Sequence, residues 1–157
     1  MKFGVVILTN NRDKFLKQAL RSVLNQKLKP ASIVVIDNAG SKVTKKIFSS
    51  FFKKKNYFYK QITKIKNVAI LRNLGSQMLN VNYIAFLDDD DYWDKDYLYR
   101  VKENLNKKKY DMIVTNIKRI DGTKKSKFTF FNDKTILKIK DFLKKNPGTL
   151  CSNLIVE

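Results

Sequence analysis

Short apolar runs alternate with amphipathic segments through the first half of the chain, and this alternation limits the possible folds more than any other feature. Residues 3–8 (FGVVIL) and 32–36 (SIVVI) are continuous runs rich in β-branched side chains, typical of strands buried on both faces. Apolar residues recur with the helical period at 15–24 and again at 43–52. The order strand, helix, strand, helix predicts an α/β fold with a mostly parallel sheet flanked by helices.

The second half continues the pattern less regularly. The elements expected there are strands at 57–65, 83–87 (YIAFL), 112–117 and 150–156, and helices at 71–79, 97–105 and 135–145. Asp121-Gly122 predicts a hairpin turn, with a return strand through residues 128–131. Because no linker, repeat or low-complexity segment interrupts the chain, we expect a single domain.

The chain is strongly basic and contains no histidine: 33 Lys and Arg face 14 Asp and Glu, a net charge of +19. Without histidine, Ser-His-Asp and Cys-His catalysis and His-containing metal sites are excluded. The charge allows attraction to nucleic acid, to anionic lipid head groups or to a phosphate-bearing substrate. The alternative is that the charge reflects only a Lys-rich composition, because the lysines are spread along the chain rather than gathered in one block.

The location expected from the sequence is cytoplasmic, with a peripheral position at the inner membrane face as the other possibility. One cysteine, Cys151, allows no internal disulfide. No signal peptide is recognisable, and no apolar stretch approaches the roughly 20 residues that span a bilayer.

Four consecutive aspartates, Asp88 to Asp91, directly follow the expected strand at 83–87. Adjacent carboxylates repel one another, and a divalent cation such as Mg²⁺ or Mn²⁺ relieves that repulsion through hard oxygen ligands. In open α/β sheets, ligands bind beyond the carboxyl ends of the strands, where this cluster lies. The alternative is a solvated acidic turn that caps the next helix. Four of only 14 acidic residues lie at this one strand end, which favours a metal site.

Polar side chains at other strand ends are expected to converge on the same edge of the sheet. They are Thr9, Asn11 and Arg12 after the first strand, Asp37 after the second, and Arg72 before the fourth. This set offers an acceptor for a base N–H, donors for ribose or phosphate, and a metal for a diphosphate. It suits a nucleoside diphosphate whose phosphates depend on the metal, since no Gly-rich phosphate loop is present.

Four segments give the chain a resemblance to the family 2 glycosyltransferases of the GT-A fold. They are VVILTNNR (5–12), SIVVIDNAGS (32–41), LRNLG (71–75) and YIAFLDDDDYW (83–93), in the family's order and spacing. The resemblance implies a GT-A-like (Rossmann-like) nucleotide-sugar-binding domain over residues 1–157, incomplete at its C-terminus. It implies sugar transfer from a UDP-linked donor to a hydroxyl acceptor, usually with inversion, in bacterial glycan or polysaccharide synthesis.

The resemblance also implies roles for individual residues. The residue matching Asp37 binds the uracil-type base in the family, and the arginine matching Arg72 lies at the nucleotide. The triplet matching Asp88, Asp89 and Asp90, the DxD motif, holds ribose and metal. Asp90 is then the direct ligand of Mn²⁺ or Mg²⁺, and the metal stabilises the departing diphosphate.

The chain departs from the family pattern in three ways. Leu8 stands where the family usually has proline, and residues 67–71 replace a longer, glycine-containing approach to Arg72. The family's general base lies beyond the last residue, Glu157, which is a poor candidate for that role. No catalytic residue is therefore assigned, and the acceptor, a glycan or lipid-linked sugar, is expected to bind elsewhere.

Two other functions are compatible with parts of the sequence. A sugar nucleotidyltransferase also uses metal-binding aspartates on such a sheet, but no Gly-rich activating loop follows the N-terminus. A basic, non-enzymatic module would bind nucleic acid in a salt-sensitive way, unaffected by Mn²⁺ or by loss of Asp90. Four aspartates without a metal would repel phosphate, which argues against a nucleic-acid partner.

Overall fold

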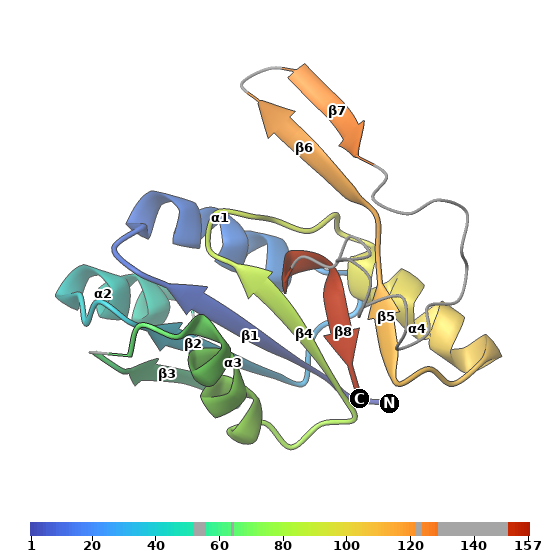
Figure 1. Cartoon of the computed structure of the whole chain (residues 1–157), viewed down its shortest axis with the longest axis horizontal. Helices are drawn as coiled ribbons and strands as arrows, with labels where there is room; N and C mark the ends of the chain where they lie inside the picture. The colour runs from blue at the N-terminus through green and yellow to red at the C-terminus, as the bar shows by residue number, and fades with distance from the viewer. Residues whose placement is uncertain (52–55, 64, 122–123, 129–150) are drawn as a thin grey trace.

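The computed structural model describes residues 1–51, 56–63, 65–121, 124–128 and 151–157 (Figure 1). Its main sheet has six strands in the order β3-β2-β1-β4-β8-β5, and β6 and β7 form a separate hairpin. The strands are β1 (Phe3–Thr9), β2 (Ser32–Asp37), β3 (Tyr57–Gln61), β4 (Tyr83–Asp88), β5 (Met112–Val114), β6 (Ile117–Asp121), β7 (Lys124–Phe128) and β8 (Leu154–Val156). The helices are α1 (Asp13–Leu24), α2 (Lys42–Phe51), α3 (Val68–Gln77) and α4 (Tyr97–Lys107), with a 3₁₀ turn η1 at Cys151–Asn153.

The predicted parallel sheet is confirmed in its first four strands. β1 pairs in parallel with both β2 and β4, and β2 pairs in parallel with β3. All six residues of β2 are buried, as the continuous apolar run predicts for a central strand covered on both faces. The result is a mostly parallel α/β sheet, as the alternating pattern predicts.

Helices cover both faces of this sheet (Figure 1). The larger core joins one face of the strands to α1, α2 and α4, through buried side chains that include Leu16, Ile47 and Leu98. On the other face α3 packs Leu71 against Val34 and Ile36. The amphipathic periods at 15–24 and 43–52 therefore mark the faces that α1 and α2 bury.

The strand order changes direction at β1. The chain adds β2 and then β3 on one side of β1, and then crosses to place β4 on the other side. In open α/β sheets a crevice opens at such a point, beyond the carboxyl ends of the two diverging strands. Here these ends are Thr9 of β1 and Asp88 of β4.

Several predicted boundaries are wrong. β3 ends at Gln61 rather than at residue 65. α3 begins at Val68 rather than at residue 71, because the side chain of Asn67 caps it by accepting from the N–H of Ala69 at 2.9 Å. The helix ends at Gln77 rather than at residue 79, so Arg72 lies within it and does not open it.

The expected strand at 112–117 is two strands in different sheets. After β5 the N–H of Thr115 donates to the Asn153 carbonyl (3.0 Å), and the Asn153 side chain donates to the Thr115 carbonyl (2.8 Å). These bonds end the ladder, and the chain turns into the β6–β7 hairpin, which stands away from the main sheet (Figure 1). β7, at Lys124–Phe128, is a return strand that begins before the predicted one, and residues 129–131 of the prediction lie outside the described residues.

The last strand is the main topological difference from a purely parallel sheet. β8 runs antiparallel between β4 and β5, preceded by η1. The expected helix at 135–145 and the Gly122 turn lie outside the described residues. None of the helices in the described segments is long and apolar enough to cross a membrane.

Candidate nucleotide-binding site

The sheet register brings three predicted site residues to one edge. Thr9 pairs with Asp37 across β1 and β2, and Leu8 pairs with Asp88 across β1 and β4. Because side chains alternate along a strand, Asp88 faces the side of the sheet that α3 covers, while Asp89 faces the opposite side. The aspartate cluster therefore has polar partners on both faces.

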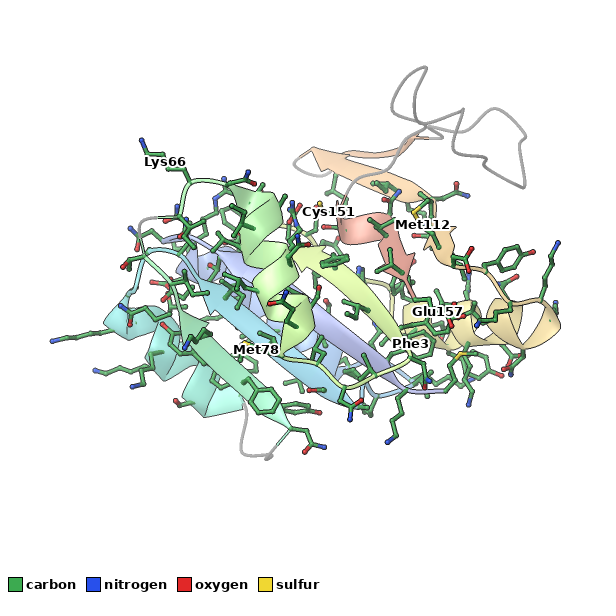
Figure 2. The ribbon with its side chains drawn as sticks, turned by 60° about the horizontal axis from the view of Figure 1, so that its bottom comes forward. Phe3, Lys66, Met78, Met112, Cys151 and Glu157 are labelled. Carbon is green, nitrogen blue, oxygen red and sulfur yellow. The ribbon has the colours of Figure 1, made fainter. Side chains whose placement is uncertain are left out.

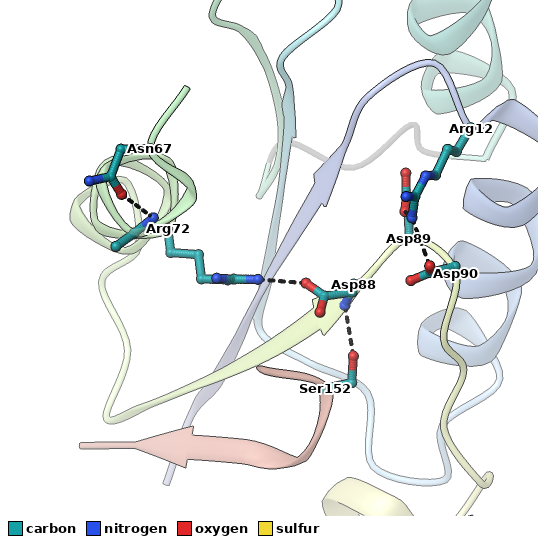
Figure 3. A network of polar contacts seen from close by, with 8 residues as sticks. Arg12, Asn67, Arg72, Asp88, Asp89, Asp90 and Ser152 are labelled. Carbon is teal, nitrogen blue, oxygen red and sulfur yellow. Dashed lines mark hydrogen bonds and ion pairs between the residues drawn. The ribbon is translucent and has the colours of Figure 1, made fainter. Parts of the chain in front are cut away.

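On the α3 face, Asp88 binds Arg72. Arg72 Nη2 lies 2.8 Å from Asp88 Oδ1, and both side chains are partly buried (Figure 3). Arg72 reaches the edge because α3 lies close against the sheet in this region (Figure 2). The predicted grouping of Arg72 with the aspartates is thus present, although the arginine comes from within a helix.

On the other face, Asp89 lies close to Arg12 and Thr9. Asp89 is 4% exposed, and its Oδ1 is 3.4 Å from Arg12 Nη1. Burial raises the pKa of Asp89, and the charge on Asp90 adds to this, whereas Thr9, Arg12 and the Asn10 N–H lower the pKa. The Thr9 hydroxyl lies close enough to stabilise the charged form of Asp89, and it has no other partner among the described residues. Thr9 and Asp89 thus form a buried polar pair at this edge.

Asp90 is more exposed and binds the same arginine. Arg12 Nη1 lies 2.7 Å from Asp90 Oδ2, with both side chains about half exposed (Figure 3). Asn11, which precedes this arginine, has a φ of 56°, in the left-handed region that asparagine tolerates better than most residues. The β1–α1 turn thus carries Arg12 to the aspartates, while Asn11 itself is exposed.

Asp37 reaches the same edge but is fully engaged with its own turn. Its carboxylate, 0% exposed, accepts from the N–H groups of Ala39, Gly40 and Ser41 and from the Tyr59 hydroxyl. Burial raises the pKa of Tyr59, and the hydrogen bond to Asp37 raises it further. A carboxylate has about four lone-pair directions, so these four donors occupy all of them.

The side-chain oxygen of the neighbouring Asn38, unlike the carboxylate of Asp37, accepts no hydrogen bond from the described residues. This Oδ1 atom is buried. The main-chain N–H of Asn38 donates to the Thr9 carbonyl at 2.9 Å, which fixes the residue beside the end of β1. Asn38 is therefore a free acceptor at the site that sequence reasoning missed, and its only signal was its place directly after Asp37.

The aspartates carry the hard oxygen donors that a divalent cation prefers. Within the described segments no group of three or more His, Cys, Asp or Glu side chains is arranged to bind a metal by itself. Mg²⁺ sites often use only one or two carboxylates together with substrate phosphates. Asp88 and Asp90 can supply such a pair of oxygen donors.

Two further residues support the aspartate loop from distant parts of the chain. Ser152 accepts from the N–H of Asp88 through its hydroxyl oxygen at 3.0 Å. The fully buried Gln26 accepts from the N–H of Leu98 (3.0 Å) and donates to the Asp94 carbonyl (2.8 Å). Neither residue carries a local sequence signal, because the contacts span 64 and 72 residues.

Trp93 packs in the core, as expected for an aromatic residue after a strand end. It is 6% exposed, stacks on Tyr97 with 4.5 Å between ring centroids, and donates its indole N–H to the Ser152 carbonyl. Tyr92 is 45% exposed. Of these two neighbouring aromatic residues, Tyr92 is thus the one accessible to a ligand.

Glu157 lies at the wrong edge of the sheet to act as a base here. In the antiparallel β4–β8 ladder Val156 pairs with Ile84, near the amino end of β4, whereas Asp88 ends β4. Its carboxylate binds Lys109 at 2.6 Å. The structure thus agrees with the expectation that Glu157 is a poor candidate.

Curated relatives of the chain are bacterial glycosyltransferases. The poly(ribitol-phosphate) β-N-acetylglucosaminyltransferase TarS of Staphylococcus aureus is 25% identical over 125 residues, covering 78% of this chain and 22% of that protein. Glycosyltransferase GlyA of Streptococcus pneumoniae is 24% identical, covering 73% of this chain and 16% of that protein. The chain therefore spans about a fifth of the length of these relatives.

Solved structures share the fold. S. aureus TarS in complex with UDP-GlcNAc matches with a TM-score of 0.72 at 24% identity, covering 79% of this chain and 36% of that one. A mannosyltransferase from Pyrobaculum calidifontis in complex with GDP-Man and Mn²⁺ matches with a TM-score of 0.62 at 17% identity, covering 75% and 36%. These matches confirm the GT-A-like fold.

The family itself is shown by a match over nearly the whole chain. The sequence profile described as Glycosyl transferase family 2 matches residues 4–153, which include all four segments of the resemblance and the aspartate cluster. The chain therefore belongs to glycosyl transferase family 2.

Proposed function

We propose that residues 1–157 form the nucleotide-sugar-binding domain of a glycosyltransferase. The expected reaction is transfer of a sugar from a UDP-linked donor to a hydroxyl acceptor, with inversion. The observation that carries the proposal is the meeting of Asp88, Asp89 and Asp90 with Arg12 and Arg72 at the switch point between β1 and β4. Family membership and the UDP-GlcNAc complex of the related TarS support it.

The two arginines supply positive charge on both sides of the aspartates. In the structure they neutralise Asp88 and Asp90, at 2.8 and 2.7 Å. Guanidinium groups bind phosphate oxygens as readily as carboxylates. A bound diphosphate would therefore share Arg12 and Arg72 with the aspartates, while the carboxylates would face a cation.

Asp90, with Asp88 beside it, is the residue that would hold Mn²⁺ or Mg²⁺. Its carboxylate is half exposed and accessible from solvent, unlike that of Asp89. A divalent cation there would offset the negative charge that develops on the departing diphosphate.

The nucleotide base is expected to contact the turn that follows β2. Asp37, the residue predicted to bind the base, already accepts four hydrogen bonds, and we propose that it holds this turn in the shape that receives the base. The free Oδ1 of Asn38 is the better acceptor for the N–H of a uracil-type base. Thr9, at the end of β1, and the exposed Asn11 in the turn after it are also proposed to contact the nucleotide.

The acceptor is proposed to be a glycan or a lipid-linked sugar. A lipid-linked acceptor would bring this chain of net charge +19 to an anionic membrane surface at the cytoplasmic face. The general base remains unassigned among the described residues.

The test is calorimetric titration of UDP into the protein with Mn²⁺, with EDTA, and in the variant Asp90→Asn. We expect metal-dependent binding that weakens about tenfold or more in the variant, because a direct metal ligand is lost. Asp111→Asn is the matched control: it makes the same charge change at an exposed residue beyond the other end of the sheet. It should bind UDP as the wild type does.

Other outcomes separate the alternatives. If no nucleoside diphosphate binds with either metal, the proposal is overturned. Tight, salt-sensitive binding of DNA or RNA that ignores Mn²⁺ and Asp90→Asn would instead support a nucleic-acid-binding module.

A further inference from the structure

The N–H of Asp88 lies beyond the backbone ladder on one side of β4. β8 pairs with β4 only at Ile84 and Ala85, near the start of that strand. Three residues further on, the N–H of Asp88 donates to the hydroxyl oxygen of Ser152 at 3.0 Å (Figure 3). The Ser152 hydroxyl thus accepts the hydrogen bond that a main-chain carbonyl of a neighbouring strand would otherwise accept, at the point where the aspartate cluster begins.

Ser152 also meets the loop beyond Asp88. Burial raises the pKa of Asp91, the nearby Ser152 hydroxyl lowers it, and the charges on Asp90 and Asp88 raise it. The main-chain carbonyl of Ser152 accepts from the indole N–H of Trp93 at 2.9 Å. One buried serine, 9% exposed, therefore binds the loop at the first residue of the cluster and at the tryptophan that follows it.

The segment that carries Ser152 is itself firmly placed. Asn153 exchanges two hydrogen bonds with Thr115, and β8 follows directly with pairs to both β4 and β5. Figure 2 shows the labelled neighbour Cys151 beside the carboxyl end of β4. Ser152 is thus fixed by the sheet, while residues 89–96, apart from turns, have no regular secondary structure.

We propose that Ser152 is a positioning residue of the donor site, which holds the aspartate loop in the conformation that binds a divalent cation and a nucleoside diphosphate. The inference rests on the proposed function. Four adjacent carboxylates repel one another, so the loop needs fixed donors if Asp88 and Asp90 are to face one cation. Groups that orient metal ligands in this way usually contribute 10–100-fold to metal affinity.

The experiment compares Ser152→Ala with Ser152→Thr and with the control Ser32→Ala. Ser32 is a matched control, since it is 8% exposed and its hydroxyl donates to one main-chain carbonyl, that of Asn56, at 2.7 Å. It begins β2, at the edge of the sheet away from the aspartates. Each protein is titrated with UDP in the presence of Mn²⁺, its thermal unfolding is measured, and the hydrogen exchange of the Asp88 amide is followed by NMR.

We expect Ser152→Ala to weaken Mn²⁺-dependent UDP binding about tenfold or more, with Ser152→Thr restoring most of the affinity because it keeps the hydroxyl. The Asp88 amide should exchange faster in Ser152→Ala only. Ser32→Ala should lower the unfolding temperature by a similar amount and leave UDP affinity unchanged. If Ser152→Ala does not fold, Ser152→Cys in reducing buffer takes its place, as the thiol is a weaker hydrogen-bonding group.

The outcomes separate the two proposals. If the wild type binds no nucleoside diphosphate with Mn²⁺, the proposed function fails and this inference fails with it. If the wild type binds and Ser152→Ala binds equally well, only the positioning role of Ser152 is overturned. Equal losses of affinity in Ser152→Ala and Ser32→Ala would also overturn it, since a general loss of stability would then explain both.

Discussion

At the scale of single residues, Asp37 and Asn38 show how adjacent polar side chains take different tasks. Asp37 is fully buried and its four hydrogen-bond donors hold the turn from Asn38 to Ser41 and the side chain of Tyr59. Asn38 has a buried acceptor without a partner. Saturated buried groups stabilise a fold, whereas a buried acceptor left unpaired costs free energy unless a ligand completes it.

This difference predicts that one substitution weakens ligand binding and the other lowers stability. Asn38→Ala should weaken Mn²⁺-dependent UDP binding roughly fivefold, the worth of one hydrogen bond, with little change in stability. Asp37→Asn should lower the free energy of unfolding by about 2 kcal/mol or more, because an amide cannot accept from all four donors. Urea unfolding and calorimetry on both variants check this. A stable Asp37→Asn protein that has lost UDP binding would instead assign the base contact to Asp37.

At the scale of elements, the close approach of α3 to the sheet brings Arg72 to Asp88. Gly75, one turn after Arg72, makes the approach possible: a Cβ there would lie 2.7 Å from Cγ1 of Val6 and 3.3 Å from Cγ1 of Ile36. Val6 is a stiff, fully buried β-branched side chain, so it cannot move aside easily. The helix must therefore shift if the glycine is replaced.

Gly75→Ala should be destabilising although alanine favours helices. The propensity gain is about 1 kcal/mol, whereas overpacking a core costs about 1–3 kcal/mol, so we expect a net loss near 1 kcal/mol. UDP affinity should fall as well, because Arg72 moves with the helix. Ser76→Ala is the control, because it removes only the hydrogen bond from the Ser76 hydroxyl to the Arg72 carbonyl. It should change stability and UDP affinity little. A more stable Gly75→Ala protein would show that the contact is loose.

At the scale of the whole molecule, β8 is the strand that joins β5 to the parallel strands β1 to β4 within the described residues. The order β4-β8-β5 means that β5 has no other partner, and that β4 would become an edge strand without it. Ile155 of β8 is completely buried in the larger core. Residues 151–157 thus link β4 to β5 and, through Ser152, contact the aspartate loop.

Ending the chain after residue 150 should therefore cost about 3 kcal/mol or more of the free energy of unfolding, since a buried isoleucine and two ladders are lost. An exposed edge at β4 should also promote aggregation, which size-exclusion chromatography detects. Glu157→Gln, which removes only the exposed ion pair with Lys109, should behave as the wild type does. A shortened chain that unfolds at the same urea concentration would show that β8 contributes little.

Much of this protein follows from its sequence alone. The alternation of apolar runs and amphipathic segments predicted the parallel strands β1, β2 and β4 and the helices α1 and α2, because both periods report local burial. The strand ends predicted that Thr9, Arg12, Asp88, Asp89 and Asp90 would meet, because parallel strands end at one edge of a sheet.

Only the tertiary structure decided the rest. Three features depend on contacts between segments that are distant in the sequence. Ser152 accepts from the N–H of Asp88, β8 lies antiparallel between β4 and β5, and Gln26 supports the loop before α4. The saturation of Asp37 beside a free Asn38 depends on the turn geometry and on Tyr59. Periodicity reports which side of an element is buried, but the partner of each polar group is set by how the elements pack.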